Sequence, residues 1–320
     1  MNFKLAPLSL ALAGSLLAAP AFAEMHWQNN SLTYLYGKNF AVDSGQDGRE
    51  ADIQQTITFE HASGWNWGDM FLFVDHKWFN GHSGKDGRTY YGEFSPRLSL
   101  GKVTGKDLSF GPIKDVLISA TYERGESQAD GTPNQNYLLG PAVDLEVPGF
   151  DRFAINTYYR KPDGATGKAS GQWQITPTWA MTIPVGKSDI LFDGYIDWVV
   201  NDAGSKNSGD YVAKNLHINP QIKYDLGKAL DKKAGMLYVG IEYDYWSNKL
   251  VSPALRTPVR GPGGLQLADA CGIQPHRVVV EARVHRIHPV GLRRVQGVEQ
   301  PLPHGRVAAP GHLCVRRNHG

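Results

Sequence analysis

Apolar and polar residues alternate along most of the chain between about Ser31 and Lys249. In the segment 189–200, for example, apolar residues occupy one set of alternate positions, while Asp193 and Asp197 fall on the other set. A period of two is typical of β-strands whose two faces meet different surroundings, and clusters of Gly, Asn, Asp and Ser separate the segments. The pattern predicts eleven strands, centred near Tyr34, Ile57, Phe73, Phe94, Ile118, Leu139, Ile155, Ile175, Tyr195, Ile218 and Val239.

The length of these strands favours a membrane protein. Many are about 10 residues long, which suits a tilted crossing of a bilayer, whereas strands of soluble proteins average about five to six residues. An open sandwich would also alternate, with its polar face in water. Charges well inside the polar faces favour a water-filled lumen instead, and aromatic residues near the ends of the apolar faces resemble interfacial girdles. These aromatic residues are Trp78, Trp173, Trp179, Trp198, Tyr224 and Tyr245.

The fold class predicted is therefore all-β, a transmembrane antiparallel β-barrel. Backbone groups in lipid must be paired within the protein, so the sheet has to close. Bacterial single-chain barrels have an even number of strands, so we expect twelve, of which eleven are recognisable. The twelfth is missing at the point where the composition of the chain changes.

That change comes after Lys249. From Leu250 to Gly320 the chain contains no Phe, Trp, Tyr or Lys, and it holds both cysteines, Cys271 and Cys314. The first 249 residues carry a net charge of −5 and the remainder +7, so the overall +2 averages two unlike segments. We interpret 24–249 as the barrel and 250–320 as a basic tail, out of frame or disordered. A basic tail can bind nucleic acid, but no recognition motif is present, so no such partner is expected.

The start of the chain predicts export. Lys4 precedes an apolar run from Leu5 to Ala19, and Ala21-Phe22-Ala23 is a small-x-small cleavage signal, so residues 1–23 are expected to be a signal peptide. The run is shorter than the roughly 20 residues of a transmembrane helix. A mean hydropathy of −0.36 is compatible with an outer-membrane barrel, because its strands alternate lipid-facing and lumen-facing residues.

The segment 69–80 carries the most informative polar face. Phe71, Phe73, Asp75 and Lys77 alternate with residues that would face lipid. Aromatic rings in a water-filled lumen are costly unless something stacks on them. A solute with a flat ring and hydroxyl groups would use the rings for stacking and the charged groups for hydrogen bonds. Alternatively, the rings pack against a loop folded into the lumen.

Further charged residues lie on the same predicted surface. Glu93 and Arg97 share one strand face, where they could pair with each other or with Asp75 and Lys77 as a structural ion-pair network. The candidate solute-binding residues are Phe71, Phe73, Asp75, Lys77, Glu93, Arg97, Asp193 and Asp197.

The sequence gives little support for a catalytic activity. The sequence contains no Gly-x-Ser-x-Gly, His-Glu-x-x-His or phosphate-loop motif, and its histidines show no metal-ligand spacing. A lipid-cleaving barrel would need a Ser or Thr beside a His on its outer face, and no histidine has an evident serine partner in the sequence. We therefore expect no enzyme, metal or cofactor. The histidines considered are His26, His61, His76, His82 and His217.

Three stretches resemble a known family. Ser95-Pro96-Arg97-Leu98-Ser99-Leu100, with Thr104-Gly105-Lys106-Asp107-Leu108-Ser109-Phe110-Gly111-Pro112, resembles the signature of the nucleoside-specific channel-forming family, Tsx-like and closest to its OmpK-type branch. Asp193-Gly194-Tyr195-Ile196-Asp197-Trp198 is similar to a later strand of that family, and Val74-Asp75 lies where the family has a similar strand.

The resemblance implies a monomeric twelve-stranded barrel, surrounded by outer-membrane lipid and inserted by the barrel-assembly machinery. It implies passive diffusion of nucleosides or similar ring-bearing solutes, and a role as phage or colicin receptor in some members. Carried over to the matched segments, it points to Phe73, Asp75, Glu93 and Arg97. Family members end in a strand with a terminal aromatic, whereas this chain ends in Asn318-His319-Gly320. A general small-solute porin and a surface receptor are the alternatives, and a lipid-modifying barrel enzyme comes after them.

Overall fold

The computed structural model describes residues 23–41, 50–80, 87–126, 133–162, 169–206, 208–247, 271–273 and 277–287. Almost all of the expected signal peptide and most of the expected tail lie outside these ranges. Within them, no helix is both long enough and apolar enough to cross a membrane.

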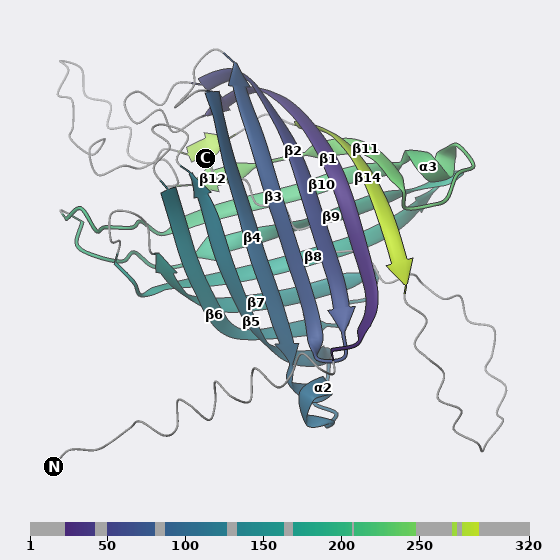
Figure 1. Ribbon diagram of the computed structural model, residues 1–320, viewed down its shortest axis with the longest axis horizontal. Coiled ribbons are helices and arrows are strands. Elements are labelled where there is room, and N and C mark those ends of the chain that lie inside the picture. The colour runs from purple at the N-terminus through teal and green to yellow at the C-terminus, as the bar shows by residue number, and fades with distance from the viewer. Residues whose placement is uncertain are drawn as a thin grey trace.

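The described chain is a strongly curved antiparallel sheet with two short helices (Figure 1). All eleven strands predicted from the alternation are present. The first eight strands are β1 (Met25–Ala41), β2 (Glu50–Trp65), β3 (Gly68–Asn80), β4 (Arg88–Ser99), β5 (Ile113–Glu126), β6 (Pro133–Leu145), β7 (Arg152–Pro162) and β8 (Gln172–Val185). The remaining elements are β9 (Ser188–Val199), β10 (Asn215–Asp225), β11 (Leu237–Glu242), β12 (Tyr245–Ser247), β13 (Cys271–Ile273) and β14 (Arg277–Ile287), with the helices α2 (Leu100–Thr104) and α3 (Leu226–Ala229).

The sheet closes on itself. Each strand from β1 to β10 pairs with the next in sequence, and β10 pairs with β11. Strand β11 pairs with β14, and β14 pairs with β1 over the residues Trp27 to Tyr36. Strands β1 to β11 and β14 therefore make a closed ring of twelve, which satisfies their backbone groups without an open edge. Figure 1 shows β1 to β4 across the near side of this barrel and β7 to β10 crossing behind them.

The closing strand comes from the segment after Lys249, where the sequence predicts no strand. Strand β14 contains Val278, Val279 and Val280, and β-branched residues favour extended backbone. The edges of β1 and β11 offer it two rows of unpaired backbone groups. Pairing depends on an extended backbone more than on aromatic content, which explains why the change in composition after Lys249 does not preclude a strand. The origin of the tail in a shifted reading frame stays a prediction.

The strand predicted around Val239 is interrupted. Strands β11 and β12 pair with the same strand, β10, on either side of Tyr243 and Asp244. Pro220 lies opposite this gap, and proline has no N–H to donate to the neighbouring strand. The N–H of Tyr243 still donates to the Pro220 carbonyl at 3.0 Å, so the two halves remain in line.

The two faces of the barrel differ as the alternation predicts. On β3, Val74 is 44% exposed on the outer face and Asp75 is fully buried on the inner face. The outer face carries an apolar surface that suits lipid, because so large an exposed apolar area is unusual in water. Representative outer residues are Leu32, Phe59, Val74, Phe94, Leu98, Leu139, Trp198, Ile222 and Ile241.

The family-like stretch after β4 forms a structured turn. Helix α2 begins after Ser99, whose hydroxyl accepts a hydrogen bond from the Lys102 N–H at 3.1 Å, and ends at Gly105 with φ of 69°. Beyond it, Ser109 donates from its hydroxyl (2.6 Å) and its N–H (2.9 Å) to Asp107, and these bonds hold the pKa of the Asp107 carboxyl below its usual range. Specific local contacts thus account for the shape of this turn.

Substitution of Gly105 by alanine should lower the free energy of unfolding by about 1 kcal/mol, because a Cβ disfavours a positive φ. Urea unfolding in detergent micelles measures the change. Gly209→Ala is the matched control, because a Cβ at Gly209 meets no atom within 4 Å and its φ is not in the left-handed region. Equal effects of the two substitutions would show that the helix end does not depend on this conformation.

Candidate functional site

All eight candidate residues lie on the inner face of the barrel and are buried. None is more than 7% exposed, so the predicted orientation is confirmed for each. They occupy two walls: β3 and β4 carry six of them, and β9 carries Asp193 and Asp197. The interior is therefore filled by polar, charged and aromatic side chains, and is not a wide open pore.

The predicted aromatic residues pack against other rings. The ring centroids of Phe71 and Phe73 are 6.0 Å apart, and those of Phe73 and Tyr91 are 5.8 Å apart. Tyr195, on the opposite wall, belongs to the same cluster, together with Ala62. Among the described residues, these rings are stabilised by contacts across the lumen, so an inward-folded loop is not needed to cover them.

Polar groups surround this aromatic cluster. Asp75 accepts a hydrogen bond from the Thr58 hydroxyl at 2.5 Å, and Lys77 Nζ lies 3.8 Å from the same carboxylate. The ammonium of Lys77 is also 6.0 Å from the centre of the Tyr91 ring, whose hydroxyl donates to Glu93 at 2.8 Å. Rings and charges therefore lie next to one another on one wall of the lumen.

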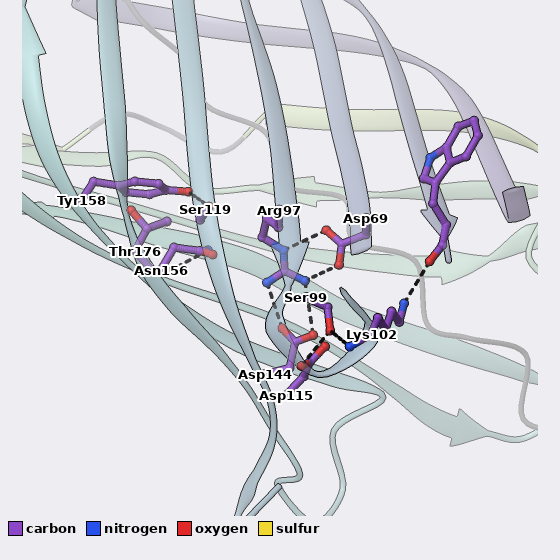
Figure 2. A network of polar contacts seen from close by, with 11 residues as sticks. Asp69, Arg97, Ser99, Lys102, Asp115, Ser119, Asp144, Asn156, Tyr158 and Thr176 are labelled. Carbon is purple, nitrogen blue, oxygen red and sulfur yellow. Dashed lines mark hydrogen bonds and ion pairs between the residues drawn. The ribbon is translucent and has the colours of Figure 1, made fainter. Parts of the chain in front are cut away.

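Arg97 forms the densest ion-pair network (Figure 2). Its Nε and one terminal nitrogen donate to the two oxygens of Asp69 at 2.8 and 2.6 Å. The two terminal nitrogens donate to the two oxygens of Asp144 at 2.8 and 3.3 Å. The guanidinium thus joins β3, β4 and β6, as the structural reading of this residue predicts, but its partners are not Glu93, Asp75 or Lys77.

The far wall holds a second group of charges. Lys223 Nζ lies 2.8 Å from Asp193, and both side chains are fully buried. Asp197 accepts hydrogen bonds from Gln174 at 2.9 Å and from Thr176 at 2.7 Å. Because Asp193 and Asp197 lie on β9, across the barrel from β3 and β4, the eight predicted residues lie on two walls of the interior and do not converge on one point.

Some inward networks were not assigned from the sequence. Arg160 forms two bonds of 2.7 Å with Glu123, which also accepts from Asn136. His217 lies 3.1 Å from Asp244 and 3.3 Å from the Tyr195 hydroxyl. The alternation places these residues inside, but it does not say which strands their partners come from.

His61 has a serine neighbour on the outer face, although no partner is evident from the sequence. Its Nε2 lies 3.1 Å from Ser63 Oγ and its Nδ1 lies 2.9 Å from Asn30 Oδ1. The Trp65 indole N–H also donates to Ser63 Oγ at 2.9 Å, and Ser63 is fully buried. Since no substrate can reach a buried serine oxygen, we read this group as polar side chains that satisfy one another beside lipid.

A cavity of about 40 Å³ opens inside the barrel beside Arg97. Phe71, Glu93 and Arg97 line it from one wall, as the sequence suggests. The residues that line it from β7 and β8 were not predicted, although their parity places them inside. These are Arg152, Asn156, Tyr158 and Thr178. In the part of the chain that the structure describes, no group of His, Cys, Asp and Glu could hold a metal ion.

Comparison with known proteins places this barrel in a family. The family described as nucleoside-specific channel-forming protein, Tsx, matches residues 26–250. Outer membrane protein OmpK of Vibrio parahaemolyticus is 31% identical over 124 residues, which cover 37% of this chain and 44% of that protein. Nucleoside-specific channel-forming protein Tsx of Salmonella typhimurium is 30% identical over 101 residues, or 29% of this chain and 35% of that protein.

These matches span less than half the length of either relative. Among solved structures, the KdgM porin in complex with disordered oligogalacturonate shares 9% identity over 82% of this chain and 99% of that chain, with a TM-score of 0.36, too low to establish a common fold. The family match covers more than half of the chain, and its limits coincide with the alternating region. The chain belongs to the family of Tsx nucleoside-specific channel-forming proteins.

Proposed function

We propose that this protein is an outer-membrane channel through which nucleosides, or similar small ring-bearing solutes, diffuse passively. Family membership supports this function, and so does the closed barrel with an apolar outer face. The observation that carries the proposal is the lumen, where Phe71, Phe73, Tyr91 and Tyr195 pack beside hydrogen-bonded carboxylates. Such a surface offers a nucleoside stacking for its base and hydrogen bonds for its sugar.

Selectivity follows from the filled interior. The lumen side chains already contact one another, so a solute enters by replacing those contacts. A flat ring can replace the ring-on-ring contact of Phe73 with Tyr91, and a hydroxyl can replace the Tyr91 hydroxyl on Glu93. A solute that cannot replace both loses interactions as it enters. Several weak sites in series would let a solute enter and leave again.

The remaining parts of the proposal concern the surroundings of the barrel. The apolar outer face contacts outer-membrane lipid, and the chain acts as a monomer inserted by the barrel-assembly machinery. The family is one of channel-forming proteins, and we propose no catalytic activity for this member. A role as phage or colicin receptor would fall to the segments that join the strands, and some of these, such as 42–49 and 81–86, lie outside the described residues.

Liposome swelling with the full chain tests the proposal. Uridine should enter about fivefold faster than a sugar of similar size, a preference of about 1 kcal/mol. Equal rates for the two solutes would indicate a general small-solute pore. If neither solute causes swelling, the receptor function is favoured over a channel.

The substitution Phe73→Leu should reduce the preference for uridine about threefold, because it removes a stacking surface worth about 0.5–1.5 kcal/mol. The same swelling assay measures the change. Phe94→Leu is the matched control, since Phe94 lies on the neighbouring strand and faces outward. If both variants retain the preference, the ring cluster does not contribute to selectivity.

A further inference from the structure

Three buried polar atoms around the cavity have no hydrogen-bond partner among the residues that the structure describes. They are Nε of Arg152, Oδ1 of Asn156 and Oγ1 of Thr178, and all three side chains line the cavity beside Arg97. Asn156 is only 6% exposed and Thr178 only 2%. A buried polar atom without a partner costs about 1–3 kcal/mol, so such atoms usually bind water or a ligand.

The three side chains are neighbours on one wall. Arg152 and Asn156 lie on the inner face of β7, and Thr178 of β8 pairs with Ala154, which lies between them. One wall thus offers an N–H donor, a carbonyl acceptor and a hydroxyl that can donate or accept a hydrogen bond.

The carboxylates near Arg152 are hydrogen-bonded to another residue. Asp69 and Asp144 are the acidic groups that act on it electrostatically, yet both oxygens of each already accept hydrogen bonds from Arg97. Arg152 forms no ion pair within the described chain. The charged side chains that line the cavity itself are Asp69, Glu93, Arg97 and Arg152, two of each sign, so the lining favours an uncharged polar group.

The cavity also has aromatic walls. Trp27 and Phe71 line it from β1 and β3, and Tyr158 lines it from β7. Figure 2 shows Asn156 and Tyr158, both of β7, to the left of Arg97. A heteroaromatic ring carries its donors and acceptors at its edge, in the ring plane, while its faces are free to contact aromatic side chains. The cavity of about 40 Å³ can hold such an edge, but a whole nucleoside would need more room.

We propose that Arg152, Asn156 and Thr178 bind the hydrogen-bonding edge of a nucleobase as it passes. Arg152 donates its Nε–H to a ring carbonyl, Asn156 Oδ1 accepts the adjacent ring N–H, and the Thr178 hydroxyl bonds to a further edge atom. This site rests on the proposed channel function and adds to it a means of telling bases apart. It predicts that a ring N–H next to a carbonyl strengthens binding.

Two solutes test the assignment of Asn156. Uridine has a ring N–H between two carbonyls, and in 3-methyluridine a methyl group replaces that hydrogen. Reduction of ion current through the full chain in planar bilayers gives an apparent Kd for each solute. We expect uridine to bind about tenfold more tightly in the wild type, and we expect Asn156→Leu to bring the ratio of the two Kd values close to one.

A matched pair of threonines provides the control. Thr178→Val should weaken uridine binding about threefold to fivefold, while Thr33→Val should leave it unchanged. The two threonines are alike, since both are buried with an unpartnered hydroxyl, but Thr33 does not line the cavity.

Equal Kd values for uridine and 3-methyluridine in the wild type would overturn the site and leave the channel function intact. Equal effects of Thr178→Val and Thr33→Val would also overturn it, because the cavity atoms would then bind only water. This comparison stands even if Asn156→Leu does not assemble. If neither solute reduces the current, the proposed function is overturned instead, and the site with it.

Discussion

Truncation of the chain after Asn248 is expected to abolish assembly of a stable barrel. The truncation removes β14, which pairs with β1 from Trp27 to Tyr36 and with β11 from Leu237 to Glu242. Both strands would then present unpaired N–H and C=O groups to lipid, at a cost of several kcal/mol for each group. Refolding into detergent micelles, followed by the heat-dependent shift in gel mobility and by protease resistance, measures assembly.

Truncation after Ile287 is the matched control. It keeps β14 and removes only residues 288–320, so the barrel should assemble as the full chain does. If the chain that ends at Asn248 also gives a protease-resistant barrel, then β14 is not the strand that closes it.

Replacement of Arg97 by methionine is expected to lower the free energy of unfolding by about 3–5 kcal/mol, since it leaves Asp69 and Asp144 near each other without their shared cation. Equilibrium unfolding in urea, with the barrel in detergent micelles, measures the loss. The triple variant Asp69→Asn, Arg97→Met, Asp144→Asn should recover part of it, because it removes the carboxylates together with their partner.

Arg88→Met is the control for charge and side-chain length. Arg88 lies at the start of the same strand and is exposed, so its loss should change stability by less than about 1 kcal/mol. Similar effects of Arg97→Met and Arg88→Met would mean that the network in Figure 2 contributes nothing beyond an ordinary surface contact.

The sequence predicts which way a side chain faces because alternation is a local property. Asp75 must be inside if Val74 is outside, whatever the rest of the barrel does. The residue with which a side chain pairs on another strand is not a local property. Arg97 reaches Asp144 through the stagger and tilt of β4, β5 and β6, and these depend on the geometry of the whole ring.

Two other features escaped prediction for different reasons. The composition changes after Lys249, and the tail was therefore interpreted as out of frame or disordered, so the pairing of Val278–Val280 with β1 and β11 was not anticipated. The alternation places Arg152 and Asn156 inside the barrel, as it does the other inward residues. A sequence does not show, however, which inward groups lack hydrogen-bond partners. That distinction depends on both oxygens of Asp69 and Asp144 being engaged by Arg97.

The ring of strand pairings also has a consequence for the rate of folding. Around most of the barrel each strand pairs with its neighbour in sequence, so these hairpins can form early and quickly from contacts of low sequence separation. The seam between β1 and β14 is different, because it joins the two ends of the described chain. Ordering so long an intervening chain before any seam contact forms is entropically unfavourable. Ion pairs between strands two apart, such as Arg97 of β4 with Asp144 of β6, also require the sheet to have curled already. Seam formation should therefore be the slow step, with hairpin formation observed well before protease resistance.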